Sequence, residues 1–293
     1  MTSCPHTLKD IQSCHSYTIQ DIQNDFKKLN EFNANENTRK FCGNKILYKY
    51  QFHNLLKCKR EEKKYKTIEE IYESPDEIEK LWQETIKRNR RKKGVNSARD
   101  MYEVFRINRG AIVFFKSSTA KYIYKKYGAT SILDPTAGWG GRMLGAASLG
   151  LKYTGMDTNK NLKEGYDNMR KDLGIKKKDC AMKWGSCFYW DFSKIDYDFV
   201  LTSPPYVNME LYEGMKPFES NELFYRQFLI PLMNKCFLYM KQGGHMCFNI
   251  SPKMYKDLIK NGYRECDIKE DMRQQLGAAY KTKSQDYTYI WKK

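Results

Sequence analysis

From residue 131 onward, short apolar runs alternate with longer segments in which apolar residues recur at helical spacing. This pattern predicts strands at 131–134, 153–157, 181–185, 199–203 and 245–250, and helices at 142–149, 159–173, 221–240 and 252–261. Residues 287–291 predict a last strand. An alternation of strands and helices is typical of a doubly wound, mostly parallel α/β sheet with helices on both faces.

The N-terminal part of the chain has a different pattern. Residues 1–60 are polar, and no clear periodicity is found before Ile46. Residues 61–91 predict a helix that restarts at Ser74, because serine can cap a helix and Pro75 suits its first turn. Two more helices are predicted at 97–107 and 110–127. We therefore expect a mainly helical N-terminal region, residues 1–95, followed by an α/β domain, residues 96–293.

Composition and charge narrow the class of partner. Hydrophobic residues make up 41% of the 293 residues, which suffices for a buried core. The formal net charge is +17, and lysine and arginine displace counterions from phosphate backbones, so a nucleic acid is the expected partner. The alternative is that the lysine-rich surface only keeps the protein soluble.

One cationic run stands out, from Lys87 to Lys93, and a glycine follows it. Cations are favourable at the end of a helix, yet so many like charges repel one another unless an anion lies against them. The predicted contacts to a nucleic-acid backbone are Arg88, Arg90, Arg91, Lys92 and Lys93. A solvated helix end is the alternative.

Several classes of protein are excluded at this point. No apolar run approaches the roughly 20 residues that a membrane span requires, and the N-terminus lacks the features of a signal peptide. The nine cysteines show no regular pairing, which favours free thiols in the cytoplasm or nucleus over a secreted protein. Seven cysteines and histidines precede residue 60, but their spacing matches no familiar zinc motif, so no metal is expected.

The first candidate site follows the strand at 131–134. The sequence Asp-Pro-Thr-Ala-Gly-Trp-Gly-Gly-Arg, residues 134–142, forms a glycine-rich turn and opens a helix, where bare backbone lets a nucleotide-like ligand approach closely. The third glycine of a dinucleotide fingerprint is missing, and Asp134 suits a positively charged amino group better than a pyrophosphate. Asp157 ends the next strand, where a carboxylate either accepts both ribose hydroxyls or caps the following helix.

The second candidate site follows the strand at 199–203. The sequence Thr-Ser-Pro-Pro-Tyr, residues 202–206, places a hydroxyl, two prolines and an aromatic ring at the carboxyl end of the strand. Ligands bind at that edge of open α/β sheets. Prolines fix the backbone and cannot donate, so nearby carbonyls stay free to accept hydrogen bonds. An ordinary proline turn is the alternative.

Together the two sequences resemble motifs I and IV of the S-adenosylmethionine-dependent DNA amino-methyltransferases, which modify N4 of cytosine or N6 of adenine. Residues 207–212 also resemble the segment that follows motif IV in many phage and viral relatives. The resemblance covers roughly residues 105–293. It implies a seven-stranded, Rossmann-like methyltransferase sheet that ends in an antiparallel hairpin, with S-adenosyl-L-methionine as cofactor and DNA as partner.

The resemblance also assigns residues. Asp134 would bind the methionine end of the cofactor and Asp157 its ribose. Lys116 and Thr119 either contact the cofactor carboxylate or only pack their helix against the fold. The full cofactor set is Lys116, Thr119, Asp134, Pro135, Ala137, Gly138, Gly140, Asp157, Ser186 and Cys187. The catalytic set is Ser203, Pro204, Pro205 and Tyr206. Ser203 and the Pro204 carbonyl would accept from the exocyclic amine, and Tyr206 would stack on a flipped base.

Some alternatives stay open. Serine in the first position of the second motif leans towards cytosine, without excluding adenine. Asn208 and Glu210 either contact the target base or shape the loop. The same chemistry on RNA and an inactive, cofactor-binding subunit are the rival functions. A protein glutamine substrate is disfavoured by Ser203 and by the positive charge.

Overall fold

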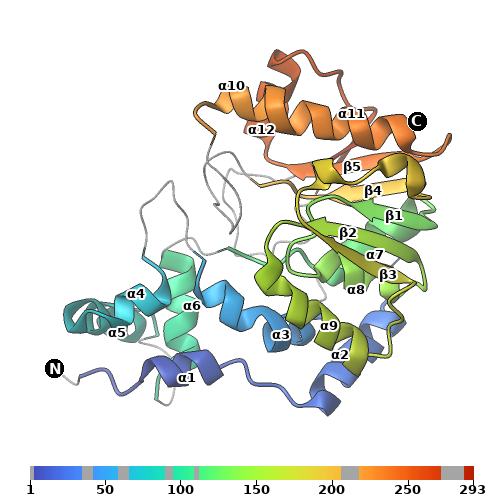
Figure 1. Ribbon diagram of the computed structural model, residues 1–293. Coiled ribbons are helices and arrows are strands. Elements are labelled where there is room, and N and C mark those ends of the chain that lie inside the picture. Colours follow the sequence, from blue (N-terminus) through green and yellow to red (C-terminus); the bar gives the residue numbers. More distant parts are fainter. Residues whose placement is uncertain are drawn as a thin grey trace.

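The computed structural model describes residues 3–34, 42–58, 66–89, 95–108, 112–205, 218–271 and 287–293. Within these residues, seven strands form one sheet in the order β3-β2-β1-β4-β5-β7-β6 (Figure 1). The strands are β1 (Ser131–Asp134), β2 (Lys152–Asp157), β3 (Cys180–Trp184), β4 (Phe199–Thr202), β5 (His245–Ile250), β6 (Ile268–Asp271) and β7 (Tyr287–Lys292).

The pairing of the strands confirms the predicted fold class. Strands β3, β2, β1, β4 and β5 are mutually parallel, whereas β7 runs antiparallel to both β5 and β6. Each strand predicted from the sequence is present with bounds that differ by no more than one residue. The family resemblance also implied the antiparallel hairpin that β6 and β7 form.

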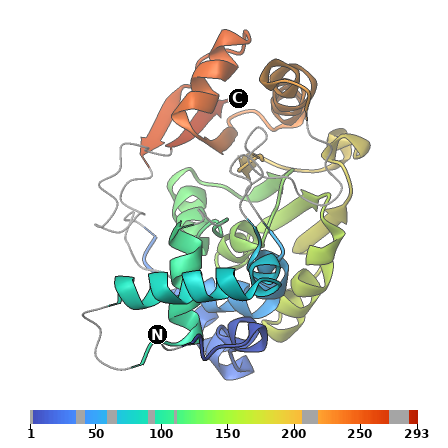
Figure 2. The ribbon, with the colours of Figure 1, turned by 90° about the vertical axis from the view of Figure 1, so that its left-hand side faces the viewer.

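Helices cover both faces of this sheet. One face carries α7 (Ser117–Lys126), α8 (Gly141–Ala147) and α9 (Lys163–Asp172), and the other carries α10 (Asn221–Phe224), α11 (Ile230–Tyr239) and α12 (Pro252–Lys260) (Figures 1 and 2). Successive strand residues alternate between the two cores, so Ile132 faces the α7 side and Leu133 the α11 side. A π-helical turn, Tyr225–Leu229, joins α10 to α11.

The N-terminal helices are α1 (Leu8–Ser13), α2 (Ile19–Glu31), α3 (Asn44–Leu56), α4 (Ile68–Tyr72), α5 (Pro75–Arg88) and α6 (Ala98–Asn108). The predicted restart at Ser74 is confirmed, because Ser74 separates α4 from α5 and Pro75 stands in the first turn. Sequence reasoning missed α1, α2 and α3. Helices α1 and α2 begin with a threonine capping box, at Thr7 and Thr18, and this signal was present in the sequence.

The N-terminal helices share a hydrophobic core with the sheet. Buried residues from Ile11 to Ile290 belong to one continuous cluster. Helix α3 lies directly on α9, where a side chain at Gly165 would meet Gln51 at 2.5 Å. The Tyr50 hydroxyl also donates to the Asp172 carboxylate over 2.5 Å. The boundary expected at residue 95 thus lies between segments that pack together.

The helix predicted at 110–127 is shorter than expected. Residues 112–116 are not helical, and α7 begins only at Ser117. The cause is tertiary packing, because the Phe115 carbonyl lies so close to Gly141 that a Cβ there would come within 1.9 Å of it. If residues 112–116 were helical, this segment could not extend across the glycine turn as it does.

No helix among the described residues is long and apolar enough to cross a membrane.

A candidate cofactor and substrate site at the carboxyl edge of the sheet

The carboxyl ends of β1, β2 and β4 meet at one edge of the sheet. Asp134 ends β1 and pairs in register with Gly155, and Asp157 ends β2 two residues later. Ser203 follows β4 directly. Because β1 lies between β2 and β4, the glycine turn after β1 is flanked by Asp157 on one side and by Ser203 on the other.

The glycine turn is held by backbone and side-chain hydrogen bonds. The Ala137 amide donates to the Met156 carbonyl over 2.8 Å, and the Tyr166 hydroxyl donates to the Gly138 carbonyl over 2.9 Å. Gly138 and Gly140 have φ of 58° and 101°, which favours glycine at both positions. A Cβ on Gly138 would meet nothing within 4 Å, so one side of the turn is open. Pro135, Ala137 and Gly140 are buried beneath it.

Asp157 faces this turn. Its Oδ2 accepts from the Gly138 amide over 2.7 Å, and its Oδ1 accepts from the Asn159 amide over 2.9 Å. Burial raises the pKa of Asp157 to about 6, although the two amides act in the opposite direction. The short helix that follows is capped by the Asn159 side chain. Each carboxylate oxygen keeps acceptor capacity that these two bonds do not use.

Asp134 is fully buried and accepts from three side chains. Arg142 donates from Nε to Oδ2 over 2.7 Å and from Nη2 to Oδ1 over 3.3 Å. The Tyr153 hydroxyl donates to Oδ2 over 2.7 Å, and the Thr202 hydroxyl donates to Oδ1 over 2.8 Å. Groups of the chain itself thus surround both oxygens. The expected contact of Asp134 to the methionine end of a cofactor stays a prediction.

The second motif lies against the turn. Pro204 and Pro205 are buried, whereas Ser203 is partly exposed. The Ser203 hydroxyl donates to the Asn249 carbonyl over 3.3 Å, and the Ser203 carbonyl accepts from the Thr136 hydroxyl over 3.1 Å. Thr136 belongs to the glycine turn, so the two motifs are in direct contact. Tyr206, Asn208 and Glu210 lie outside the described residues.

The segment 112–116 packs over the turn from the α7 side. The Phe114 ring meets the Trp139 ring at a centroid distance of 5.7 Å, and the Arg142 guanidinium lies 5.1 Å from the Phe115 ring centroid. Lys116 precedes α7 and is half-buried, and this burial lowers its pKa to about 8. Thr119 is buried in the first turns of α7. Their expected contact to a cofactor carboxylate stays a prediction.

The segment after β3 borders the other side of Asp157. The Gly185 amide donates to the Asp157 backbone carbonyl over 2.8 Å, Ser186 caps a short 3₁₀ turn, and Cys187 is buried. Lys235 of α11 donates to the carbonyls of Phe188 and Trp190 over 3.2 and 2.7 Å and fixes this turn. Sequence reasoning missed Lys235 and Tyr153, because no local motif marks a side chain that reaches across the fold. It gave no role to Arg142 and Thr202, although both lie within the two motifs.

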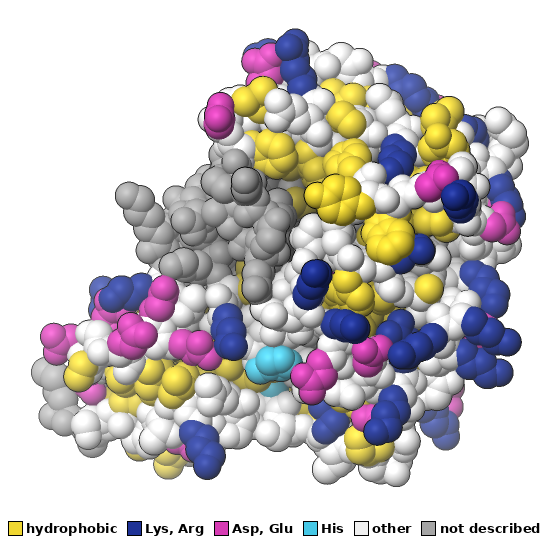
Figure 3. All heavy atoms as spheres, viewed as in Figure 1, with side chains coloured by type: hydrophobic (Ala, Val, Ile, Leu, Met, Phe, Trp, Pro, Cys, Tyr) yellow, Lys and Arg dark blue, Asp and Glu magenta, His cyan; other side chains and the backbone are white. Residues whose placement is uncertain are grey.

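Other expectations concern the surface and metals. Arg88 is exposed at the end of α5, whereas Arg90, Arg91, Lys92 and Lys93 lie outside the described residues. Dark-blue lysine and arginine side chains gather on the right of the face in Figure 3, on the side of the β3 edge.

The nine cysteines, all described, are free thiols. Among the described residues, no group of three or more His, Cys, Asp or Glu side chains is placed to hold a metal ion.

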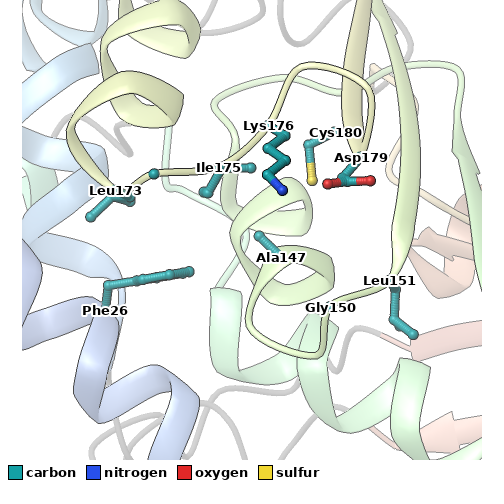
Figure 4. Close-up of a pocket in the computed structure, with 10 residues that line it drawn as sticks. Phe26, Ala147, Gly150, Leu151, Leu173, Ile175, Lys176, Asp179 and Cys180 are labelled. Carbon is teal, nitrogen blue, oxygen red and sulfur yellow. The ribbon is translucent and has the colours of Figure 1, made fainter.

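A hollow of about 220 Å³ opens at the opposite edge of the sheet (Figure 4). It lies between α2 and the amino ends of β2 and β3, with Phe26, Leu173 and Ile175 among its apolar lining residues. Lys176 and Asp179 supply charge to it. This hollow is separated from Asp157 and Ser203 by the length of the strands.

No protein-family model matches this chain, and no curated protein matches it. Solved structures with a similar fold include TrmN from Thermus thermophilus, with 14% identity and a TM-score of 0.42 over 61% of this chain and 49% of that chain. Another is an RNA methyltransferase from Salinibacter ruber in complex with S-adenosyl-L-homocysteine, with 15% identity and a TM-score of 0.40 over 61% and 92% of the two chains. A methyltransferase homolog protein from Pyrococcus horikoshii has 13% identity and a TM-score of 0.43 over 61% and 68%. The chain spans about half the length of TrmN.

Proposed function

We propose that this chain transfers a methyl group from S-adenosyl-L-methionine to the exocyclic amino group of a base in DNA. The observation that carries the proposal is the contact between the glycine turn and the Ser-Pro-Pro motif, in which Thr136 donates to the Ser203 carbonyl. The proposed site for the cofactor and the proposed site for the planar amine of the base therefore lie next to each other, at the edge of the sheet where ligands bind.

The residues present fit the cofactor. The open side of Gly138 lets a ligand approach the backbone, and Asp157 keeps acceptor capacity for two ribose hydroxyls. Ser186 and Cys187 would border the adenine, and Lys116 with Thr119 the carboxylate. The cofactor supplies the activated methyl group, so the chain needs no covalent intermediate. Because Asp134 is enclosed by Arg142, Tyr153 and Thr202, we assign to it the support of the turn.

Ser203 is suited to receive the amine. A hydroxyl accepts from an N–H group only when its own proton is directed elsewhere, and here that proton is directed to the Asn249 carbonyl. The lone pairs of Ser203 Oγ are then free to accept an amino hydrogen and to stabilise the positive charge that develops on the nitrogen. The buried prolines hold this oxygen rigidly against the turn.

The partner class follows from charge. A net charge of +17 favours a polyanion, and Tyr206 would give a flipped base a face on which to stack. DNA is proposed because the Ser-Pro-Pro-Tyr motif resembles that of the DNA amino-methyltransferases.

The deciding experiment incubates the chain with labelled cofactor and with single- and double-stranded DNA and RNA, and then analyses the nucleosides. Methylcytosine or methyladenine in DNA supports the proposal. If label were found only in RNA, RNA would be the substrate in place of DNA. Cofactor binding without transfer would indicate an inactive subunit.

Replacement of Ser203 by alanine tests the role of its hydroxyl. We expect the rate of transfer at saturating substrates to fall by about 10²–10³-fold, because one acceptor that stabilises the developing charge is removed. Cofactor affinity, measured by calorimetry, should change by less than about threefold. Ser193→Ala is the matched control, since Ser193 is an exposed serine on the 3₁₀ turn Phe192–Lys194, which lies outside both motifs. Undiminished transfer in Ser203→Ala would contradict the assigned mechanism.

A further inference from the structure

Two threonine hydroxyls connect the glycine turn to the Ser-Pro-Pro motif. Thr202 ends β4 and is fully buried, and Thr136 is the third residue of the turn sequence. Their Oγ1 atoms lie 2.6 Å apart. Neither threonine belongs to the residues expected to touch cofactor or substrate.

The direction of these hydrogen bonds follows from the neighbouring acceptors. Asp134 forms an ion pair with Arg142, and its carboxylate oxygens accept hydrogen bonds from the neighbouring side chains. The Thr202 proton therefore goes to Asp134 Oδ1, at 2.8 Å. Thr202 Oγ1 is then left to accept, and the Thr136 proton is shared between Thr202 Oγ1, at 2.6 Å, and the Ser203 carbonyl, at 3.1 Å.

This network of hydrogen bonds starts at the buried carboxylate of Asp134. Asp134 accepts from Arg142 on α8 and from Tyr153 on β2, and Arg142 also donates to the Thr136 carbonyl. The Thr136 hydroxyl is thus held at the end of β4, by Thr202, and the Thr136 carbonyl is held by Arg142 of α8. A bond network anchored on a buried carboxylate leaves little freedom for the Ser203 carbonyl to move relative to the turn.

We infer that Thr136 and Thr202 are positioning residues, which hold Ser203 and the following proline carbonyl at a fixed distance from the cofactor turn. The inference rests on the proposed function, in which the amine must lie in line with the methyl group. In-line transfer is sensitive to geometry, and a displacement of about 1 Å costs about 10²-fold in rate. The two threonines therefore act on the transfer step rather than on the binding of either ligand.

The test replaces both threonines by valine, which keeps their shape and removes their hydroxyls. We expect the double variant Thr136→Val/Thr202→Val to lose about 10–100-fold in turnover at saturating cofactor and DNA. Its dissociation constant for the cofactor should stay within about threefold of the original protein. The double variant Thr136→Ser/Thr202→Ser keeps the hydroxyls and should recover most of the turnover.

A matched control separates positioning from loss of stability. Thr85 in α5 is also fully buried and donates to a carbonyl, that of Leu81 over 2.8 Å, but it lies far from the turn. Thr85→Val should lower the melting temperature without lowering turnover. If turnover in the valine pair falls only as far as in Thr85→Val, or if cofactor affinity falls together with turnover, the inference is overturned.

A second measurement does not depend on transfer. Hydrogen exchange of the ligand-free protein should become faster at the amides of residues 201–203 and 137–139 in the valine pair, and should be unchanged in the serine pair. If the original protein transfers methyl groups to no nucleic acid, the proposed function fails, and the exchange result still decides whether the hydroxyl bridge holds the two segments together. Equal exchange in all variants would contradict the bridge.

Discussion

Replacement of Asp134 by alanine is expected to destabilise the fold by about 3–5 kcal/mol, because it leaves the buried Arg142 guanidinium without its counter-charge. The side chain of Arg142 is only 4% exposed, and that of Asp134 is fully buried, so water cannot replace the lost partner. The Tyr153 and Thr202 hydroxyls would lose their acceptor at the same time. Urea unfolding followed by circular dichroism measures this loss.

Two further variants make the outcome of this experiment specific. Asp196→Ala removes a surface carboxylate that is 77% exposed and paired with Lys241, and it should cost less than about 1 kcal/mol. Asp134→Ala/Arg142→Met removes both buried charges and should recover part of the lost stability. A loss in Asp134→Ala as small as that in Asp196→Ala would show that the buried network does not support the turn.

Replacement of Asp157 by alanine is expected to weaken cofactor binding by at least about 10–100-fold. A hydrogen bond to a charged group contributes about 1.5–3 kcal/mol, and each factor of ten in affinity corresponds to about 1.4 kcal/mol. Isothermal titration calorimetry with S-adenosyl-L-methionine measures the change. Asp167→Ala, at a partly exposed carboxylate of α9, is the control and should bind as the original protein does.

The same carboxylate predicts how binding depends on pH. Burial raises the pKa of Asp157 to about 6 from an ordinary value of 3.8, so the free protein takes up a proton there as the pH falls through about 6. Ribose hydroxyls donate to the ionised form, and binding therefore favours loss of that proton. The contribution of Asp157 to cofactor affinity should be constant above pH 7 and should fall below pH 6, by up to tenfold per pH unit. In Asp157→Ala this fall should be absent.

The central strands of the sheet could be predicted from the sequence because they are short apolar runs, as Phe199–Thr202 illustrates, where every residue is buried. Strand β6 and the six-residue helix α1 carry weaker patterns, whereas α2 was missed although its capping box was present. The start of α7 could not be predicted, since Phe114, Phe115 and Lys116 continue a helical pattern, and only their contact with Gly141 and Trp139 keeps them out of the helix. Tertiary contacts overrode the local preference at this point.

The candidate site was predicted in outline for a similar reason. Motifs at the carboxyl ends of parallel strands must share an edge, and this rule places the Gly138 turn, Asp157 and Ser203 together without any knowledge of side-chain orientation. The partners of Asp134 were not predictable in this way. Arg142, Tyr153 and Thr202 come from three elements, and only the three-dimensional packing shows that they converge on one carboxylate.

The glycine at position 165 has a practical consequence for work with fragments of this chain. Helix α3 rests on α9 at this glycine with almost no intervening space, and the same apolar cluster continues into the layer beneath the sheet. A truncated polypeptide that starts after residue 95 would leave the outer side of α9 uncovered, and an exposed apolar surface of that kind promotes aggregation. Assays of the α/β domain alone are therefore best replaced by point variants in the intact polypeptide.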